Sequence, residues 1–182
     1  MSYKLVKPSE EYIDEIRSFR EEFLVSGDSM DGTMTLKTTE NILDWLEDVR
    51  IFESSDTIPE GVPAWRVPAY LYLYVRESDG RVVGMIQFRH YLNDFLAEWG
   101  GHIGYCVRPS ERRKGYAAAM LEAVLMICRL FGLDKVLLTC RSWNEGSRRT
   151  ILKNGGKFDR KAKENPNDHA CGELERYWID LE

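Results

Sequence analysis

The stretch that decides the fold is residues 101–119, GHIGYCVRPSERRKGYAAA. An apolar segment ends at Val107, a polar loop follows, and an alanine-rich helix begins after Gly115. The first amides of a helix lack intrahelical acceptors, and with the helix dipole they favour a bound anion such as phosphate. The loop also holds four cations within seven residues, in a chain of net charge −5: Arg108, Arg112, Arg113 and Lys114. The segment therefore predicts a phosphate site, and Gly115 allows a ligand to approach the backbone closely.

Helix and strand patterns extend from this stretch in both directions. Toward the C-terminus the sequence predicts a helix at 116–131, a buried strand at 135–140, a short helix at 145–153, and strands at 158–161 and 173–181. Toward the N-terminus it predicts strands at 101–107, 81–90, 70–76 and 3–6, a helix after Pro8-Ser9, and a second helix capped by residues 38–40. The class is mixed α/β, and residues 1–182 form one expected domain because no linker or repeat interrupts them.

Composition excludes several classes of protein. Of the 182 residues, 43% are hydrophobic and 30% charged, which is ordinary for a globular domain. No run of about 18 apolar residues predicts a membrane span, and the charged residues 1–11 are unlike a signal peptide. The net negative charge argues against nucleic acid as a partner. Four cysteines without C-x-x-C or zinc spacing predict no metal site and favour the reducing cytoplasm: Cys106, Cys128, Cys140 and Cys171.

Residues 112–117, RRKGYA, match the pattern [QR]-x-x-G-x-[GA] of the GNAT superfamily of N-acetyltransferases. Val107-Arg108-Pro109 precedes the pattern at the family's offset. A helix, a strand, Asn144, another helix and Gly155-Gly156 follow in the family's order, so residues 70–181 resemble a GNAT domain. Within the superfamily, residues 100–117, the ILKNGG turn at 151–156 and the RYWI at 176–179 resemble a bacterial group of predicted acetyltransferases of unassigned substrate. The resemblance implies a mostly antiparallel sheet flanked by helices and splayed near Val107.

The resemblance also implies a geometry for acetyl-CoA. The backbone of residues 105–107 would pair with the pantetheine arm like an added strand. The amides of residues 113–118 would surround the pyrophosphate, and Asn144 would reach the pantetheine, unless it only caps a helix. The implied binding residues are Tyr105, Cys106, Val107, Arg112, Arg113, Lys114, Gly115, Tyr116, Ala117, Ala118, Asn144 and Ser147.

The implied reaction is transfer of an acetyl group to a primary amine by direct attack in a ternary complex. Many family members protonate the leaving thiolate with a tyrosine seven residues after the asparagine, but Ile151 occupies that position here. Replacements for this acid remain open: Tyr105, Tyr116, Cys140 or water. Because the tyrosine is missing, a non-catalytic acyl-CoA sensor is the alternative function, and a domain that binds another nucleotide is a third.

The amine must lose a proton before it attacks, so the reaction needs a base. Family members often supply it from the strand before the signature, where His102 lies, and its reference pKa near 6.5 suits this role. Glu98 and His90 are second choices. The glycines around His102 predict open space, although a strand histidine that only bonds backbone fits the same pattern: Gly100, Gly101 and Gly104.

The acceptor expected from the resemblance is a small-molecule or peptide amine, and the N-terminal half suggests its charge. Residues 8–60 hold fifteen acidic and four basic side chains, a balance of −11. The resemblance places this segment beside the acceptor, so a cationic amine entering between residues 27 and 35 is one hypothesis. Solvated faces of two surface helices are the other. No membrane partner is expected, and a homodimer is left open.

Overall fold

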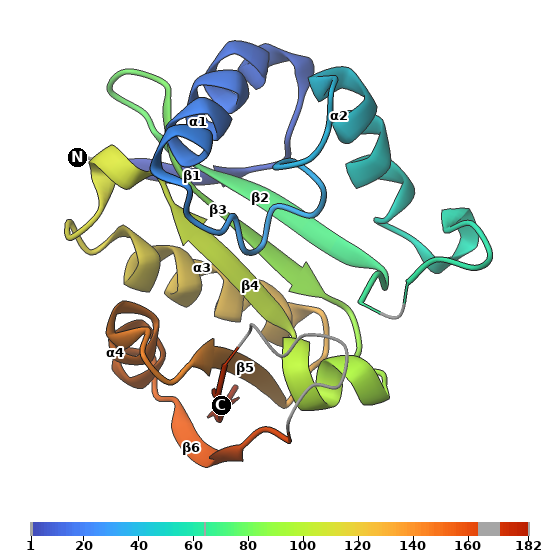
Figure 1. The fold of residues 1–182 in the computed structure, drawn as a ribbon, viewed down its shortest axis with the longest axis vertical. Helices are drawn as coiled ribbons and strands as arrows, with labels where there is room; N and C mark the ends of the chain where they lie inside the picture. The colour runs from blue at the N-terminus through green and yellow to red at the C-terminus, as the bar shows by residue number, and fades with distance from the viewer. Residues whose placement is uncertain (1, 64, 164–171, 182) are drawn as a thin grey trace.

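Two antiparallel sheets form the centre of the computed structural model, which describes residues 2–63, 65–163 and 172–181 (Figure 1). The first sheet has the order β1-β2-β3-β4, with β1 at Tyr3–Val6, β2 at Ala69–Arg76, β3 at Arg81–Arg89 and β4 at Ile103–Val107. The second has the order β5-β7-β6, with β5 at Lys135–Arg141, β6 at Lys157–Lys161 and β7 at Leu174–Asp180. Every predicted strand is present, and the mixed α/β class is confirmed.

Helices cover both faces of the first sheet (Figure 1). Leu71 and Leu73 of β2 pack into one core with α1 (Ile13–Ser26) and α2 (Ile42–Ile51). Ile86 and Phe88 of β3 pack into a second core with α3 (Tyr116–Leu130). Alternate strand residues face opposite sides of a sheet, so an almost continuous apolar strand is buried on both faces. The helix α4 (Glu145–Lys153) contributes Ile151 to the second core.

The two sheets meet at His102 and then diverge. The His102 amide donates to the Leu137 carbonyl over 2.7 Å, and the Leu137 amide donates to His102 Nδ1 over 2.9 Å. Beyond this point β4 pairs with β3 alone, from Phe88↔Ile103 to Gly84↔Val107. The edge of β4 that faces β5 therefore has no strand partner, which agrees with the expected splay of the sheet.

The glycines near His102 permit close contacts and do not leave open space, which corrects the expectation from sequence. Gly101 has φ +67°, and a Cβ there would lie 2.6 Å from the Leu137 carbonyl oxygen of β5. A Cβ on Gly104 would lie 3.1 Å from Gly32 Cα, in the loop between α1 and α2. Because neither residue has a side chain, β5 and this loop both approach β4 at van der Waals distance.

Smaller differences concern element ends. The helix α2 begins after Asn41, whose Oδ1 accepts from the Leu43 amide over 3.1 Å, and not at the predicted cap. The predicted connection before β4 contains a π-helical turn, η3, at Leu96–Gly100. Short 3₁₀ turns are η1 (Glu10–Tyr12), η2 (Ser55–Thr57) and η4 (Pro109–Glu111).

In the described part of the chain, no helix is long and apolar enough to cross a membrane, and no group of His, Cys, Asp or Glu side chains is arranged to hold a metal ion. Three cysteines are buried free thiols: Cys106, Cys128 and Cys140. Cys171 and His169 lie outside the described residues.

Candidate functional site

A cleft of about 880 Å³ lies where β4 and β5 diverge. Its walls come from β4 and the following loop, the ends of β5 and β3, the start of α4, and the loop between α1 and α2. Eleven of the twelve residues predicted to bind acetyl-CoA line it: Tyr105, Cys106, Val107, Arg112, Arg113, Gly115, Tyr116, Ala117, Ala118, Asn144 and Ser147. The exception is Lys114, whose Nζ turns to Glu111 Oε2 at 2.7 Å.

The loop between β4 and α3 presents a run of free amides. The Arg112 amide donates to the Pro109 carbonyl, and the Ala119 amide donates to the Gly115 carbonyl. Among the residues described, the six amides between them find no protein acceptor. Arg113 (φ +63°) and Gly115 (φ +84°) are left-handed, a backbone arrangement that turns successive amides toward one point. Open space surrounds Gly115, so the loop can receive an anion such as a phosphate.

Cations border this loop, but most already have partners. Arg112 donates to Asp28 Oδ2 over 2.7 Å, and that bond lowers the pKa of the Asp28 carboxyl. Lys114 pairs with Glu111, as described above. Arg113 is exposed and forms no ion pair with any described residue. The fixed amides and Arg113 are therefore the groups that an incoming anion meets first.

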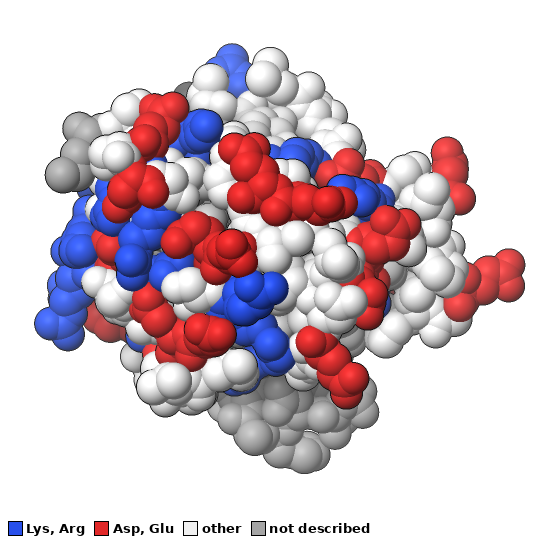
Figure 2. Space-filling view, turned by 90° about the horizontal axis from the view of Figure 1, so that it is seen from above, with Lys and Arg blue, Asp and Glu red and all other residues white. Residues whose placement is uncertain are grey.

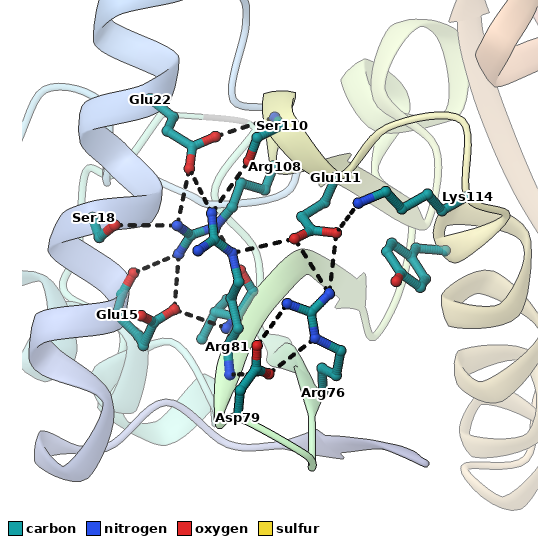
Figure 3. A network of polar contacts seen from close by, with 12 residues as sticks. Glu15, Ser18, Glu22, Arg76, Asp79, Arg81, Arg108, Ser110, Glu111 and Lys114 are labelled. Carbon is teal, nitrogen blue, oxygen red and sulfur yellow. Dashed lines mark hydrogen bonds and ion pairs between the residues drawn. The ribbon is translucent and has the colours of Figure 1, made fainter. Parts of the chain in front are cut away.

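Arg108 belongs to the interior, and its inclusion among the loop cations is corrected (Figure 3). Its side chain is 0% exposed. Nε donates to the Val82 carbonyl, Nη1 to Ser18 and Glu22, and Nη2 to the carbonyl and the carboxylate of Glu15. These contacts use all five donors of a guanidinium. Arg108 therefore ties α1 to the end of β4 and has no donor left for a ligand.

Glu111 fixes the other side of the loop (Figure 3). Its buried carboxylate accepts from Lys114 and from Arg76 Nη1 at 3.2 Å, and it lies 3.3 Å from Arg81 Nε. Burial alone would raise the pKa of this carboxyl, but Lys114 and Arg76 lower it overall. Glu22 adds a further tie by accepting from the Ser110 amide over 3.1 Å. The loop is thus held in shape by α1 and the β2–β3 hairpin, which limits the ordering that binding would require.

The structure brings none of the three candidate bases, His102, Glu98 and His90, into the cleft. The His102 side chain is 6% exposed, and Nδ1 already accepts from the Leu137 amide. Burial, reinforced by Arg89, lowers the His102 pKa to about 4. Glu98 accepts from both Nη atoms of Arg160, and this contact lowers its pKa to about 2. Both side chains hold segments together, which is the alternative that the sequence left open for His102.

A hydroxyl pair lies near the position of the missing tyrosine. Ile151 is 0% exposed and cannot donate a proton. Tyr105 Oη lies 2.9 Å from Ser147 Oγ, and both residues line the cleft. Burial raises the Tyr105 pKa to about 12, so the phenol keeps its proton at neutral pH. Asn144 caps α4, because its Oδ1 accepts from the Ser147 amide over 3.0 Å, and it lines the cleft as well.

The other candidate donors are less suited to proton transfer. Tyr116 Oη is shared with Tyr3 Oη at 2.9 Å. Burial raises the pKa of Cys140 to about 11 and raises that of Cys106 as well. These thiols remain protonated near pH 7, as expected of structural cysteines.

Sequence reasoning missed Arg89, the last residue of β3, which also lines the cleft. Its Nη1 donates to the carbonyls of Gly100 and Gly101 at 3.4 and 3.2 Å. Burial lowers the Arg89 pKa to about 10. A cation at the end of a largely apolar strand was the signal in the sequence, but no motif contains it.

Comparison with known proteins gives a family and a set of folds. Residues 39–155 match the model of the acetyltransferase (GNAT) family. None of the curated proteins matches this chain. Among solved structures, a microcin C7 self-immunity acetyltransferase in complex with acetyl-CoA and AMP is similar, with a TM-score of 0.71 and 14% identity over 98% of this chain and 92% of that chain.

Two further structures have the same fold. RimL, a ribosomal L7/L12 α-N-protein acetyltransferase in complex with coenzyme A, has a TM-score of 0.71 and 13% identity, covering 100% of this chain and 95% of that chain. RimJ of Mycobacterium smegmatis, in complex with CoA-disulfide, has a TM-score of 0.69 and 19% identity over 98% of this chain and 81% of that chain. At such identities the likeness concerns the fold.

Proposed function

The chain belongs to the GNAT acetyltransferase family, and from that premise we propose that it acts as a single domain which moves the acetyl group of acetyl-CoA to an amine in a ternary complex. One observation carries this proposal. Six consecutive amides, at residues 113–118, have no protein acceptor in the described structure and stand beside the unpaired edge of β4. Phosphates fit the amides, and an extended arm with its own amides fits the strand edge. The buried free thiols favour a reducing cytoplasm as the place of action.

Bound acetyl-CoA would supply an acetyl thioester, so that an N–C bond replaces the C–S bond and the electron pair leaves with sulfur. Tyr105 and Ser147 are the donors best placed to offer hydrogen bonds to negative charge that develops in the cleft. The Tyr105 phenol, protonated at neutral pH, fills the role left by Ile151. The amide of Val107, the last residue of β4, is a further donor to a developing oxyanion.

The amine needs a carboxylate to hold it while its proton departs. Three carboxylates line the cleft, and two are engaged: Asp28 with Arg112, and Glu111 with Arg76 and Lys114. Asp31 accepts only from Ser29 Oγ, over 2.9 Å, among the described residues. We therefore assign Asp31, in place of His102, to orient the ammonium group and to pass its proton to water. RimL, which its description calls an α-N-protein acetyltransferase, is one precedent for an amine acceptor on this fold.

Two glycine variants test the cofactor loop. Gly115 and Gly132 both have positive φ, +84° and +97°, and both have open space around the position of a Cβ. Valine should cost about the same backbone strain, roughly 1–2 kcal/mol, at each position. Only Gly115→Val narrows the approach to the free amides, so we expect its Kd for acetyl-CoA in calorimetry to rise at least tenfold. Gly132→Val, at the far end of α3, should bind as the wild type does.

Catalysis is tested by release of CoA thiol from acetyl-CoA with a panel of amines, each product being confirmed by mass. A thermal shift with acetyl-CoA, compared with ATP, separates this family's ligand from another nucleotide. The proposed function fails if acetyl-CoA does not bind, or if Gly115→Val and Gly132→Val bind it equally well.

A further inference from the structure

Among the residues that line the cleft are an arginine and an aspartate that form no ion pair within the described residues. Arg89 and Asp31 both line it, and neither forms an ion pair with any described residue. A Cβ on Gly104 would lie 3.1 Å from Cα of Gly32, the neighbour of Asp31, and 3.9 Å from Arg89 Nη1, so both residues come to the same point of β4. At this separation Asp31 raises the pKa of Arg89 against the effect of burial. Yet no oxygen of Asp31 comes within 4.0 Å of the guanidinium. A ligand between them would therefore meet a cation on one side and an anion on the other.

Arg89 is an unusual group to leave unpaired. Among the described residues, its buried Nε has no hydrogen-bond partner, and only Nη1 bonds to protein, through the carbonyls of Gly100 in η3 and Gly101 after it. Loss of water penalises a guanidinium strongly unless an anion or several acceptors compensate. An arginine offers a planar fork that matches a carboxylate with two parallel hydrogen bonds. The site around Arg89 thus suits a ligand carboxylate.

Close backbone contact with β4 fixes the loop that carries Asp31. Its neighbour Gly32 touches Gly104 of β4, so the loop between α1 and α2 lies directly on the strand. Asp31 lines the same cleft as Tyr105 and Val107 of β4. An ammonium group held by Asp31 would therefore stand beside the segment proposed to bind the thioester arm.

We propose that the acceptor is an aminocarboxylate, such as a free amino acid, whose ammonium group contacts Asp31 and whose carboxylate contacts Arg89. This inference rests on the proposed function and names its substrate class. It replaces the simple cation suggested by the acidic N-terminal segment, because a cation alone would leave Arg89 without its anion. A peptide amine without a nearby carboxylate is the competing acceptor.

The experiment compares each of a set of amino acids with its carboxamide, which keeps the amine and removes the negative charge. Acetylation is followed by thiol release and product mass. For the best acceptor we expect kcat/KM to be roughly 10- to 100-fold higher for the acid than for the amide, as for loss of a charged hydrogen bond. Arg89→Gln should reduce that ratio to near one. Arg17 is an exposed arginine on α1 whose ion pair, within the described chain, is with Asp14 alone, and Arg17→Gln should keep the ratio.

Arg89→Lys tests whether Arg89 affects the ratio only through the stability of the fold. It keeps the charge but loses the fork, so we expect a ratio between those of the wild type and Arg89→Gln, with unchanged binding of acetyl-CoA. The inference is overturned if amides react as well as acids, or if the ratio survives in Arg89→Gln. If that variant does not fold, an unchanged ratio in Arg89→Lys overturns it. If acetyl-CoA binds but neither series reacts, the aminocarboxylate is wrong while peptide amines remain. If acetyl-CoA does not bind, the proposed function fails with it.

Discussion

At His102, burial decides the role of an ionisable side chain. The neutral imidazole accepts from the Leu137 amide at the junction of the sheets, and burial lowers its pKa from 6.5 to about 4. The unfolded chain therefore binds more protons than the folded chain between these values. The contribution of neutral His102 to the unfolding free energy is complete above about pH 6.5 and is lost as the pH falls through 4. The total loss is about 3 kcal/mol.

Urea unfolding of wild type and His102→Gln over this pH range measures the effect, because glutamine can accept the Leu137 bond without titrating. We expect the difference in unfolding free energy between the two proteins to change by a few kcal/mol from about pH 7 to about pH 4. A constant difference would contradict the buried neutral histidine. A flattened pH profile of kcat in His102→Gln would restore His102 as the catalytic base.

Single residues also mark the limit of prediction from sequence. The loop glycine, the amides and Asn144 were predictable because a motif fixes their spacing relative to a helix start. Arg108 was grouped with its neighbouring cations, since nothing local shows that Glu15 and Glu22 of a distant helix enclose it. Arg89 was missed for the same reason: its chemistry depends on Asp31 and on η3, which meet it only through tertiary folding.

Among elements, the loop between α1 and α2 determines the acceptor side of the cleft. Gly32 has φ +76°, and a Cβ there would overlap the Gly104 carbonyl of β4. We expect Gly32→Ala to lower the unfolding free energy by more than about 2 kcal/mol, from overpacking together with strain. Displacement of Asp31 should raise the acceptor KM, with little change in the Kd for acetyl-CoA.

Gly61→Ala is the matched control, because Gly61 has nearly the same φ, +77°, with nothing near its Cβ position. It should show the strain alone, about 1 kcal/mol, and an unchanged KM. Equal effects of the two variants on KM would show that the contact with β4 does not position the acceptor wall.

The elements themselves were predictable, because apolar periods of 2 and 3.6 residues mark strands and helices along the chain. Their ends were less so. Asn41 caps α2, whereas the sequence predicted a cap at residues 38–40. Both positions have polar side chains that can cap a helix, so the sequence does not distinguish them. The splay between β4 and β5 was predicted from the family resemblance. The hydrogen bond between Leu137 and His102, beyond which the strands diverge, was visible only in the fold.

Over the whole molecule, the acidic excess of residues 8–60 does not produce a uniformly acidic surface. Figure 2 looks onto the end formed by α1 and α2, where acidic and basic groups lie beside one another and basic groups gather along one side. The buried Arg108 pairs with Glu15 and Glu22, and Arg112 pairs with Asp28 at the cleft. Of these fifteen acidic residues, only Asp28 and Asp31 line the cleft.

This arrangement predicts different salt responses for the two ligands. An aminocarboxylate with an uncharged side chain has no net charge, and Arg89 and Asp31 have opposite charges in the cleft, so steering by the protein's field should be weak. We expect the acceptor KM to change by less than about twofold between about 0.05 and 0.5 M salt. The Kd for acetyl-CoA should rise over the same range, because its phosphates meet the exposed Arg113 and the borders of a cationic loop. Steady-state kinetics and calorimetry on the same samples measure both.

A steep rise in acceptor KM would indicate instead that the acidic side chains attract a cationic amine. In that case Asp28→Asn with Asp31→Asn should abolish the salt dependence of the acceptor KM.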